Sequence, residues 1–406
     1  MVQGTYADPY KPESDPLSPR LKDLLPPRAR RIERRIERCL PPLPRPTVRL
    51  EMPSLTRAPA ARALSALLLL LPPGAVTGYS QEQPIAFTGA FILPVSSTPI
   101  SNGVLVIHGG RIATVGPADT PVPPDATRLD VSGRVIMPGL VDTHSHIGSV
   151  AAGDASGPIQ PEVRVLDAFN VRDPSVHRAR AGGITTVNVM PGSGHLVSGQ
   201  TLYLKLRTAQ KVDDLLLTNR HGRIAGGLKM ANGTNSRRDP PFPGTRGKSA
   251  ALVRERFVAA QDYLARIQRA NGDASKMPPR DLTLEALGEV LAGERIVQHH
   301  THRHDDILTV LRLQKEFGFK VVLHHVSDGW RVAREIAAAK APCSIILVDS
   351  PGGKLEARDL DWKTGAALEQ AGALVGFHTD DWVTDSRLFL RSAGLAVRAG
   401  MSRDGA

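Results

Sequence analysis

Short apolar runs recur along residues 136–406, and stretches with a helical spacing of apolar positions separate them. The runs cover residues 185–190, 223–229, 295–300, 320–325, 344–348 and 374–378. Alternation of this kind is typical of parallel strands joined by helices. One helix is well delimited, because Asp305 and Asp306 place negative charge in its first turn, apolar residues follow at helical spacing, and Gly318 ends it. The pattern predicts an α/β fold.

A different pattern precedes this region. Strand-like runs at 86–93, 103–108, 111–115 and 128–131 are separated by turns rich in Pro, Gly and Asn. Such spacing predicts a small β domain over residues 81–135, followed by the larger α/β domain over 136–406.

The first eighty residues divide into two segments. Residues 1–51 are rich in Pro, Arg and Glu, and we expect a disordered extension or a mis-called start. In residues 52–80, Arg57 and Arg62 are followed by an apolar block at 63–71 and small residues at 74–78, the order found in signal peptides. The block is far shorter than the roughly 20 residues needed to span a bilayer. We therefore expect cleavage near residues 78–80, a secreted or periplasmic protein, and no stable membrane insertion.

Composition narrows the candidate chemistry. The formal net charge is +11, but arginines at 28–38 contribute much of it, and aromatic residues make up only 4% of the chain. We therefore expect no nucleic-acid partner for the globular part. Cys39 and Cys343 are the only cysteines. A cysteine-based zinc site is thus excluded, and a metal would have to use His, Asp, Glu or Lys.

The run from Val135 to His146 (VIMPGLVDTHSH) carries the strongest chemical signal. His144 and His146 are two residues apart at the end of a strand-like segment, and successive alternate residues of a strand point the same way, about 7 Å apart or less. Two imidazoles so placed can meet one metal ion, although two polar histidines at a strand end are the plainer interpretation.

Other predicted strands also end in ionisable residues. In a (β/α) barrel the active groups lie at the carboxyl ends of the strands, and His and Lys are poorly tolerated in an apolar core. Repetition of the pattern on five strands therefore favours a barrel with a metal centre. The residues concerned are His144 and His146, Lys229, His300 and His302, His325, and His378 and Asp380.

With these motifs in place, residues 85–406 resemble the amidohydrolase superfamily, and within it the imidazolonepropionase-like and related metal-dependent hydrolases. The resemblance implies a (β/α)8 TIM-like barrel with a small N-terminal β-sandwich domain, C-terminally truncated because family members normally continue beyond the point matching Ala406. It rests on residues 135–146, 182–186 (GGITT), 300–307 (HTHRHDDI), 322–329 (VLHHVSDG) and 377–380 (FHTD).

The resemblance also implies a metal-ligand set. His144 and His146 match ligands from the first barrel strand, and Asp380 matches the aspartate after the eighth. His300 matches the fifth-strand histidine, with His302 as its alternative. His325 matches the sixth-strand histidine, and His324 is expected to point the other way. Lys229 is the candidate for a bridging carboxylated lysine. The alternative is that Lys229 is a surface or ion-paired lysine.

This ligand set predicts metal-assisted hydrolysis. A divalent metal, with zinc expected and one or two ions per chain, activates water at neutral pH. Asp380 would take the proton from that water and return it to the leaving nitrogen, and His325 would ligate the metal or donate to the oxyanion. His378 would either bind substrate or form a hydrogen bond in the barrel mouth. The glycine-rich loop 191–200 is placed to shape the pocket, with His195 and Gln200 as substrate contacts.

Three functions remain open at this stage. The leading one is hydrolysis of a non-peptide C–N bond in a cyclic amide or related small amide. A deaminase on the same scaffold is less favoured, because no glutamate stands beside a strand-end histidine. The third is a truncated metal-binding protein without turnover. The expected partner is a small-molecule substrate, and the oligomeric state is left open.

Overall fold

The structure is a computed structural model that describes residues 83–347 and 354–406. The predicted extension at 1–51 and signal peptide at 52–80 lie outside the described residues. Among the helices that the structure describes, none is both long enough and apolar enough to cross a membrane.

The small β domain contains one five-stranded sheet in the order β3-β2-β1-β4, with β5 also paired to β1. Every residue of β4 is exposed, and β3 buries only its last residue. The buried apolar residues of the sheet lie mainly on β1 and β2. Among the described residues this domain has one sheet, so a second layer of the predicted β-sandwich is not present there. Its strands are β1 (Ile85–Ile92), β2 (Ile100–His108), β3 (Arg111–Gly116), β4 (Thr127–Asp130) and β5 (Val135–Ile136).

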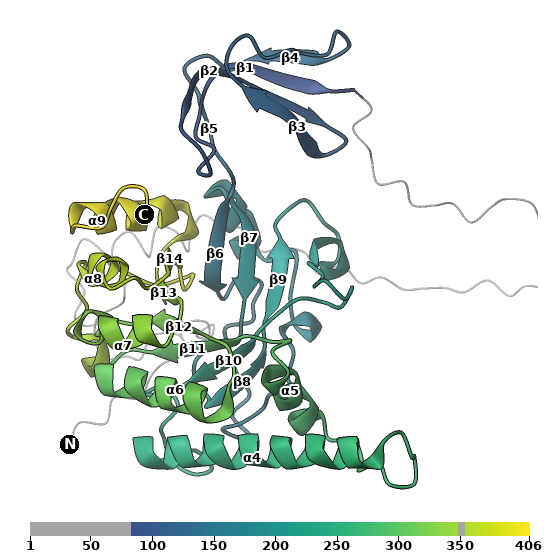
Figure 1. Cartoon of the computed structure of the whole chain (residues 1–406), viewed down its shortest axis with the longest axis vertical. Helices are drawn as coiled ribbons and strands as arrows, with labels where there is room; N and C mark the ends of the chain where they lie inside the picture. Colours follow the sequence, from purple (N-terminus) through teal and green to yellow (C-terminus); the bar gives the residue numbers. More distant parts are fainter. Residues whose placement is uncertain (1–82, 348–353) are drawn as a thin grey trace, which may run out of the picture. The chain divides into compact units, whose positions relative to one another are not determined.

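The larger domain is a mixed α/β structure with two sheets (Figure 1). Five successive strands, β10 to β14, are parallel, and β8 pairs antiparallel to β10 at one edge. The second sheet has the order β6-β7-β9. The strands are β6 (Leu140–Ser145), β7 (Ile184–Val189), β8 (Val197–Gln200), β9 (Leu202–Lys205), β10 (Leu228–Ala231), β11 (Val297–Thr301), β12 (Val321–His325), β13 (Cys343–Ile345) and β14 (Val375–Phe377).

The two sheets approach each other at two places. β8 and β9 follow each other directly, so this stretch pairs with β10 on one side and with β7 on the other. At the other end, Ser145 bridges to Asp381, and the Asp380 amide donates to the His144 carbonyl oxygen at 3.0 Å. The arrangement resembles a TIM barrel, but in the described residues the hydrogen-bonded ladder is not continuous, and β8–β9 breaks the expected all-parallel order.

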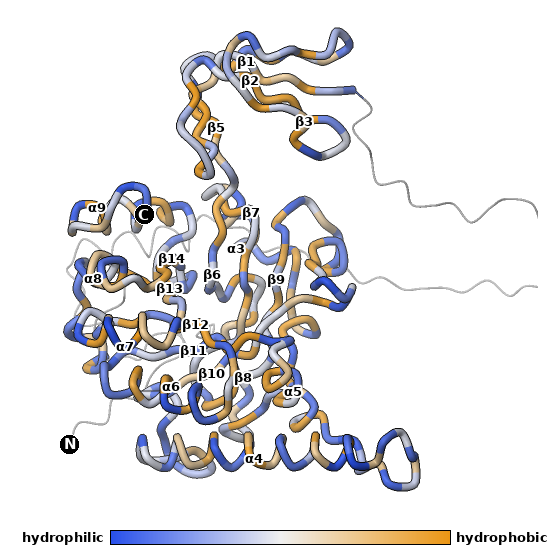
Figure 2. The backbone as a smooth tube through the Cα atoms, viewed as in Figure 1, coloured by the Kyte–Doolittle hydropathy of each residue, from blue (hydrophilic) through white to orange (hydrophobic). Residues whose placement is uncertain are grey.

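Helices cover the outer side of the parallel strands (Figure 1). Buried residues of α4, α5 and α6 pack against β10, β11 and β12 in the largest apolar cluster. Hydrophilic and hydrophobic positions alternate along α4 (Figure 2). The predicted helix is confirmed as α6, and Gly318 caps it with φ 73°. The helices are α3 (Pro174–Ala181), α4 (Arg246–Ala270), α5 (Leu282–Leu291), α6 (His304–Phe317), α7 (Ala333–Ala338), α8 (Thr364–Gln370) and α9 (Phe389–Arg398).

One predicted strand begins too early. The run at 223–229 suggested a strand ending at Lys229, whereas β10 spans Leu228–Ala231. The chain crosses Thr201 closely just before β10, since a Cβ at Gly226 would lie 1.9 Å from the Thr201 carbonyl oxygen. A strand with side chains at every position has no room there, so pairing with β11 begins only after the glycines.

Candidate metal centre

Two histidines and one aspartate meet where β6 ends. The Nε2 atoms of His144 and His146 are 3.3 Å apart, and they lie 3.2 Å and 2.9 Å from Asp380 Oδ1. The Nδ1–H of His146 donates to the Met190 carbonyl oxygen at 2.7 Å. That bond fixes the ring, so Nε2 is the nitrogen turned to the cluster, as is usual for metal-binding histidines. We call His144, His146 and Asp380 the first cluster.

The Asp380 carboxylate is held in its ionised form. Burial by itself raises the pKa of Asp380, but the close contact with His146 and the nearby positive charge outweigh burial and keep this pKa below its ordinary value. Burial lowers the pKa of His144 well below its ordinary range. A neutral His144 imidazole beside an anionic carboxylate is part of the donor set that a divalent metal requires.

Lys229 belongs to the same site. It projects from β10, its side chain is fully buried, and its Nζ lies 2.9 Å from His144 Nε2 and 3.0 Å from the Met190 sulfur. Burial lowers the pKa of Lys229 to about 7. The interpretation of Lys229 as a surface lysine is therefore wrong.

A second cluster consists of His300, His302 and His325. All three are buried, and the nitrogen atoms that they offer lie within 4.8 Å of one another. His302 Nδ1 bonds to the Ser327 hydroxyl at 2.7 Å, while Nε2 of His302 and Nε2 of His325 have no hydrogen-bond partner among the described residues. Buried polar atoms without partners cost free energy. His300 and His302, alternatives in the sequence, are thus brought together, and a metal ion would satisfy their converging nitrogens.

His378 and His324 fill the space between the clusters. The His378 ring lies 4.7 Å from the His144 ring and 4.8 Å from the His325 ring, and its Nδ1 is 2.8 Å from the Ser344 hydroxyl. Burial lowers the pKa of His378 to about 3. His324, expected to point the other way, lies 4.8 Å from the His144 ring and donates from Nε2 to the Gln298 side-chain oxygen at 2.8 Å.

The backbone explains how two consecutive histidines reach the same side of β12. His325 has φ 70° and Val326 has φ 52°, so the alternation of side chains breaks at the strand end. Asp380 also has a positive φ of 48°. Left-handed conformations in non-glycine residues each cost about 1–3 kcal/mol and gather at functional sites. The expectation that His324 turns away was therefore wrong because it assumed a regular strand.

Buried acidic residues support the first cluster from behind, and sequence reasoning missed them. Asp142 accepts hydrogen bonds from the Thr379 amide at 3.1 Å, the Thr379 hydroxyl at 2.5 Å and the His144 amide at 3.2 Å. Burial raises the pKa of Asp142 to about 7. Asp381 accepts from Arg178 at 2.8 Å. The Asp142 bonds tie β6 to the chain after β14, and the Arg178 bond ties α3 to it. Asp142 was visible in the His-x-His run as the acidic residue two positions before His144.

The two predicted substrate contacts lie in other surroundings. His195 is buried, its Nε2 donates to the Asp154 carbonyl oxygen at 2.5 Å, and its ring lies 5.4 Å from that of Phe242. The Gln200 amide donates to the Pro161 carbonyl oxygen at 3.2 Å. Neither makes a contact with the clusters within the described ranges, so their role in substrate binding stays a prediction.

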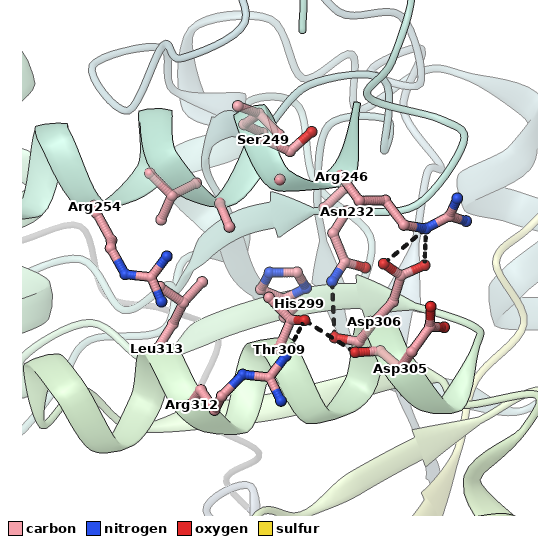
Figure 3. Close-up of a pocket in the computed structure, with 15 residues that line it drawn as sticks. Asn232, Arg246, Ser249, Arg254, His299, Asp305, Asp306, Thr309, Arg312 and Leu313 are labelled. Atoms are coloured by element: carbon pink, nitrogen blue, oxygen red, sulfur yellow. Dashed lines mark hydrogen bonds and ion pairs between the residues drawn. The ribbon is translucent and has the colours of Figure 1, made fainter. Parts of the chain in front are cut away.

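A cavity of about 390 Å³ opens between α4 and α6, with His299 at its back (Figure 3). The Nδ1–H of His299 donates to the His300 carbonyl oxygen at 3.0 Å. Because adjacent strand residues face opposite ways, this cavity lies on the helix side of β11, away from the second cluster. Its charged residues already pair with each other, as in the bond from Arg246 to Asp306 at 2.8 Å.

Comparisons with known proteins agree with this geometry. The chain is 40% identical over 347 residues to a 5-methylthioadenosine/S-adenosylhomocysteine deaminase of Symbiobacterium thermophilum, covering 79% of this chain and 74% of the relative. It is 26% identical over 336 residues to the amidohydrolase tasK of Hapsidospora irregularis, covering 74% of this chain but only 34% of that protein. The chain thus spans about a third of the length of the second relative. No protein-family model matches the chain.

A solved structure shows the same fold. The amidohydrolase from Thermotoga maritima MSB8 superposes with a TM-score of 0.72 at 30% identity, over 79% of this chain and 85% of that one. These likenesses define one class of protein, hydrolases of C–N bonds with a TIM-barrel-like α/β fold, and the histidine and aspartate clusters at the strand ends could bind a metal. Within that class, this chain belongs to the amidohydrolase superfamily.

Proposed function

We propose that this protein hydrolyses a non-peptide C–N bond in a cyclic amide or related small amide, with the help of a divalent metal. The observation that carries the proposal is the first cluster, in which Asp380 Oδ1 stands 3.2 Å and 2.9 Å from the facing nitrogens of His144 and His146. No packing requirement explains two imidazoles converging on a carboxylate that is 17% exposed at a strand end.

His144, His146 and Asp380 would hold one ion, and His300, His302 and His325 a second. Bound metal supplies Lewis acidity and a water of lowered pKa, and zinc is the ion we expect. The ionised Asp380 carboxylate accepts the proton of the attacking water and passes it to the leaving nitrogen. His325 and His378 offer buried nitrogens, without hydrogen-bond partners among the described residues, to a metal or to the developing oxyanion.

Lys229 could add a further metal ligand to the site. An amine whose pKa is about 7 is partly neutral at neutral pH, and the neutral amine is the form that takes up CO₂ as a carbamate. We therefore propose Lys229 as the carboxylated lysine that joins two metal ions. Mass spectrometry of the intact protein, with and without bicarbonate, tests this step, because carboxylation replaces a proton of Nζ by a carboxylate.

Deamination is the second candidate, and the 40% identity to a deaminase favours it. The lack of a free glutamate beside the clusters speaks against deamination. Among the described residues Asp380 is the only carboxylate of the two clusters, and the Glu356 carboxylate already accepts from the Thr234 amide at 2.7 Å and from Arg246 at 3.4 Å. Metal-loaded protein should open lactams and should release no ammonium from amino-purines or amino-pyrimidines. Ammonium release without lactam opening would establish deamination instead.

A third candidate is a metal-binding protein without turnover. It predicts metal uptake with neither lactam opening nor ammonium release.

For location, we propose export directed by residues 52–80, supported only by their order of charged, apolar and small residues. N-terminal sequencing of the natural protein tests this proposal. A mature start near residues 78–80 would agree with it, and a start at Met1 or Met52 would contradict it.

A further inference from the structure

A second cavity, of about 220 Å³, is lined by helix α3, the residues just before it and the chain that follows β9. Arg172, Arg180 and Arg207 line it together, and among the described residues no aspartate or glutamate lines it. Val176 and Leu215 also line the cavity, and both side chains are buried in the apolar core. The cavity therefore combines concentrated positive charge with a small apolar surface.

The three guanidinium groups are not neutralised by acidic side chains. Each donates hydrogen bonds only to neutral oxygens, and none forms an ion pair with a carboxylate within the described ranges. A guanidinium has five N–H donors, and these bonds use only one or two of them, so the other donors are open to a ligand. The acceptors are the Asp214 carbonyl oxygen for Arg207 at 2.8 Å and 2.5 Å, the Thr208 hydroxyl for Arg180 at 3.2 Å, and the Gln210 side-chain oxygen for Arg172 at 3.5 Å.

Helix α3 separates this cavity from the metal centre. Val176 and Arg180 are four positions apart, so they share one face of the helix, and both line the cavity. Arg178 points elsewhere and bonds to Asp381 at 2.8 Å, next to the first cluster in the sequence. No residue of either cluster lines the cavity. A ligand in this cavity would therefore occupy a site distinct from the metal centre.

The chemistry of the wall selects the kind of anion. The planar fork of arginine matches the oxygens of phosphate and carboxylate groups. At neutral pH a phosphate monoester carries close to two negative charges and offers three acceptor oxygens, one for each guanidinium, whereas a carboxylate has one charge and two oxygens. The volume lies below the roughly 300–1,000 Å³ of pockets that enclose drug-sized ligands. The cavity thus suits a phosphate group that carries a small organic part.

We propose that this cavity binds a small phosphate monoester, held by Arg172, Arg180 and Arg207. The apolar side chains of Val176 and Leu215 provide a contact surface for the organic part of the ligand. The inference goes beyond the proposed function and does not depend on a bound metal, because the residues that carry it are separate from both clusters.

Calorimetry with phenyl phosphate and with benzoate on the full chain tests the proposal. The two probes share the phenyl ring and differ in the anionic group, so their comparison separates a phosphate from a carboxylate. Arg172→Gln and Arg180→Gln remove one charge each, and Arg180→Lys keeps the charge without the fork. Arg280→Gln is the matched control, because Arg280 is 79% exposed, is paired with Glu285 and does not line the cavity. All proteins are compared in the same metal state, so any phosphate bound at the metal centre contributes equally.

We expect wild-type protein to bind phenyl phosphate about tenfold more tightly than benzoate. Arg172→Gln and Arg180→Gln should each weaken phenyl phosphate binding about tenfold, Arg180→Lys should weaken it less, and Arg280→Gln should leave it unchanged. Circular dichroism spectra check that each variant is folded.

Three results would overturn the site. They are no binding of phenyl phosphate by wild type up to about 10 mM, the same affinity in wild type and both glutamine variants of the cavity, and an equal loss in Arg280→Gln, which would reveal only a general effect of surface charge. Equal binding of the two probes would overturn phosphate as the ligand. None of these results bears on the metal centre, so the proposed function is tested separately.

Discussion

Replacing Lys229 by Met removes a buried amine at almost constant volume. The shift of the Lys229 pKa from 10.5 to about 7 corresponds to a free-energy cost of about 5 kcal/mol for burying the charged form. Below pH 7 the lysine is protonated in both folded and unfolded chains, so the folded protein carries the whole cost. Between pH 7 and 10.5 the unfolded chain binds the extra proton, and this contribution to stability rises by about 1.4 kcal/mol per pH unit.

The Lys229→Met variant should therefore be more stable than wild type when both are metal-free, by up to about 5 kcal/mol at pH 6 and by about 2 kcal/mol at pH 9. Urea unfolding in the presence of a chelator measures this difference. All three tryptophans, at positions 330, 362 and 382, lie in the α/β domain, so their fluorescence reports on the domain that contains Lys229.

Lys276→Met provides the control, because Lys276 is 70% exposed and has no burial cost to remove. Its stability should match wild type within about 0.5 kcal/mol. A stability difference between Lys229→Met and wild type that stays constant from pH 6 to pH 9 would refute the reasoning, since only a titrating buried amine produces the pH dependence. The Lys229→Met variant should also bind metal more weakly than wild type. A gain in stability together with a loss of metal affinity would show that Lys229 serves function at the expense of stability.

Two further predictions concern the surroundings of the clusters. Burial lowers the pKa of His299 to about 4 and the pKa values of His302 and His378 to about 3. As pH falls below 6.5 the unfolded chain gains these protons first, so these three rings together should lower the stability of the metal-free protein by about 3 kcal/mol between pH 6.5 and 5.5 in urea titrations. A flat profile would contradict neutral burial of these rings. Arg178→Ala removes the guanidinium partner of buried Asp381 and should cost about 3 kcal/mol in the same assay, whereas Arg254→Ala, which breaks an exposed pair with Glu316, should cost at most about 1 kcal/mol. Equal costs for the two arginines would show that burial of the carboxylate does not matter.

Features that depend only on local geometry could be predicted from the sequence. His144 and His146 could be assigned to one face because strand alternation over two residues is independent of the rest of the fold. Helix α6 could be placed because its first-turn charge, apolar stripe and Gly318 cap all lie within one short stretch. The same holds for the strand runs of the α/β domain, which coincide with β7 and β11 to β14 within a few residues.

Long-range geometry decided the rest. Whether Lys229 is buried depends on the pairing of β10 with β11, which begins only after Gly226 and Gly227, and no local pattern reveals it. His324 lies on the site side of β12 because it is in register with His300 on β11, and His325 reaches the same side only through its own positive φ. Glu356 carried no motif at all, and it lies beside the end of β10 through its bond with Thr234, 122 positions apart in the sequence.

The central claim is that His144 and His146 hold a catalytic metal, and metal content tests it most directly. Elemental analysis of purified protein spanning residues 80–406 should find one or two divalent ions per chain, two if the second cluster is also filled. The double variant His144→Ala with His146→Ala should lose the ion of the first cluster while keeping the wild-type circular dichroism spectrum. A folded wild-type protein without metal after dialysis against zinc, or an unchanged metal content in the double variant, would contradict the account.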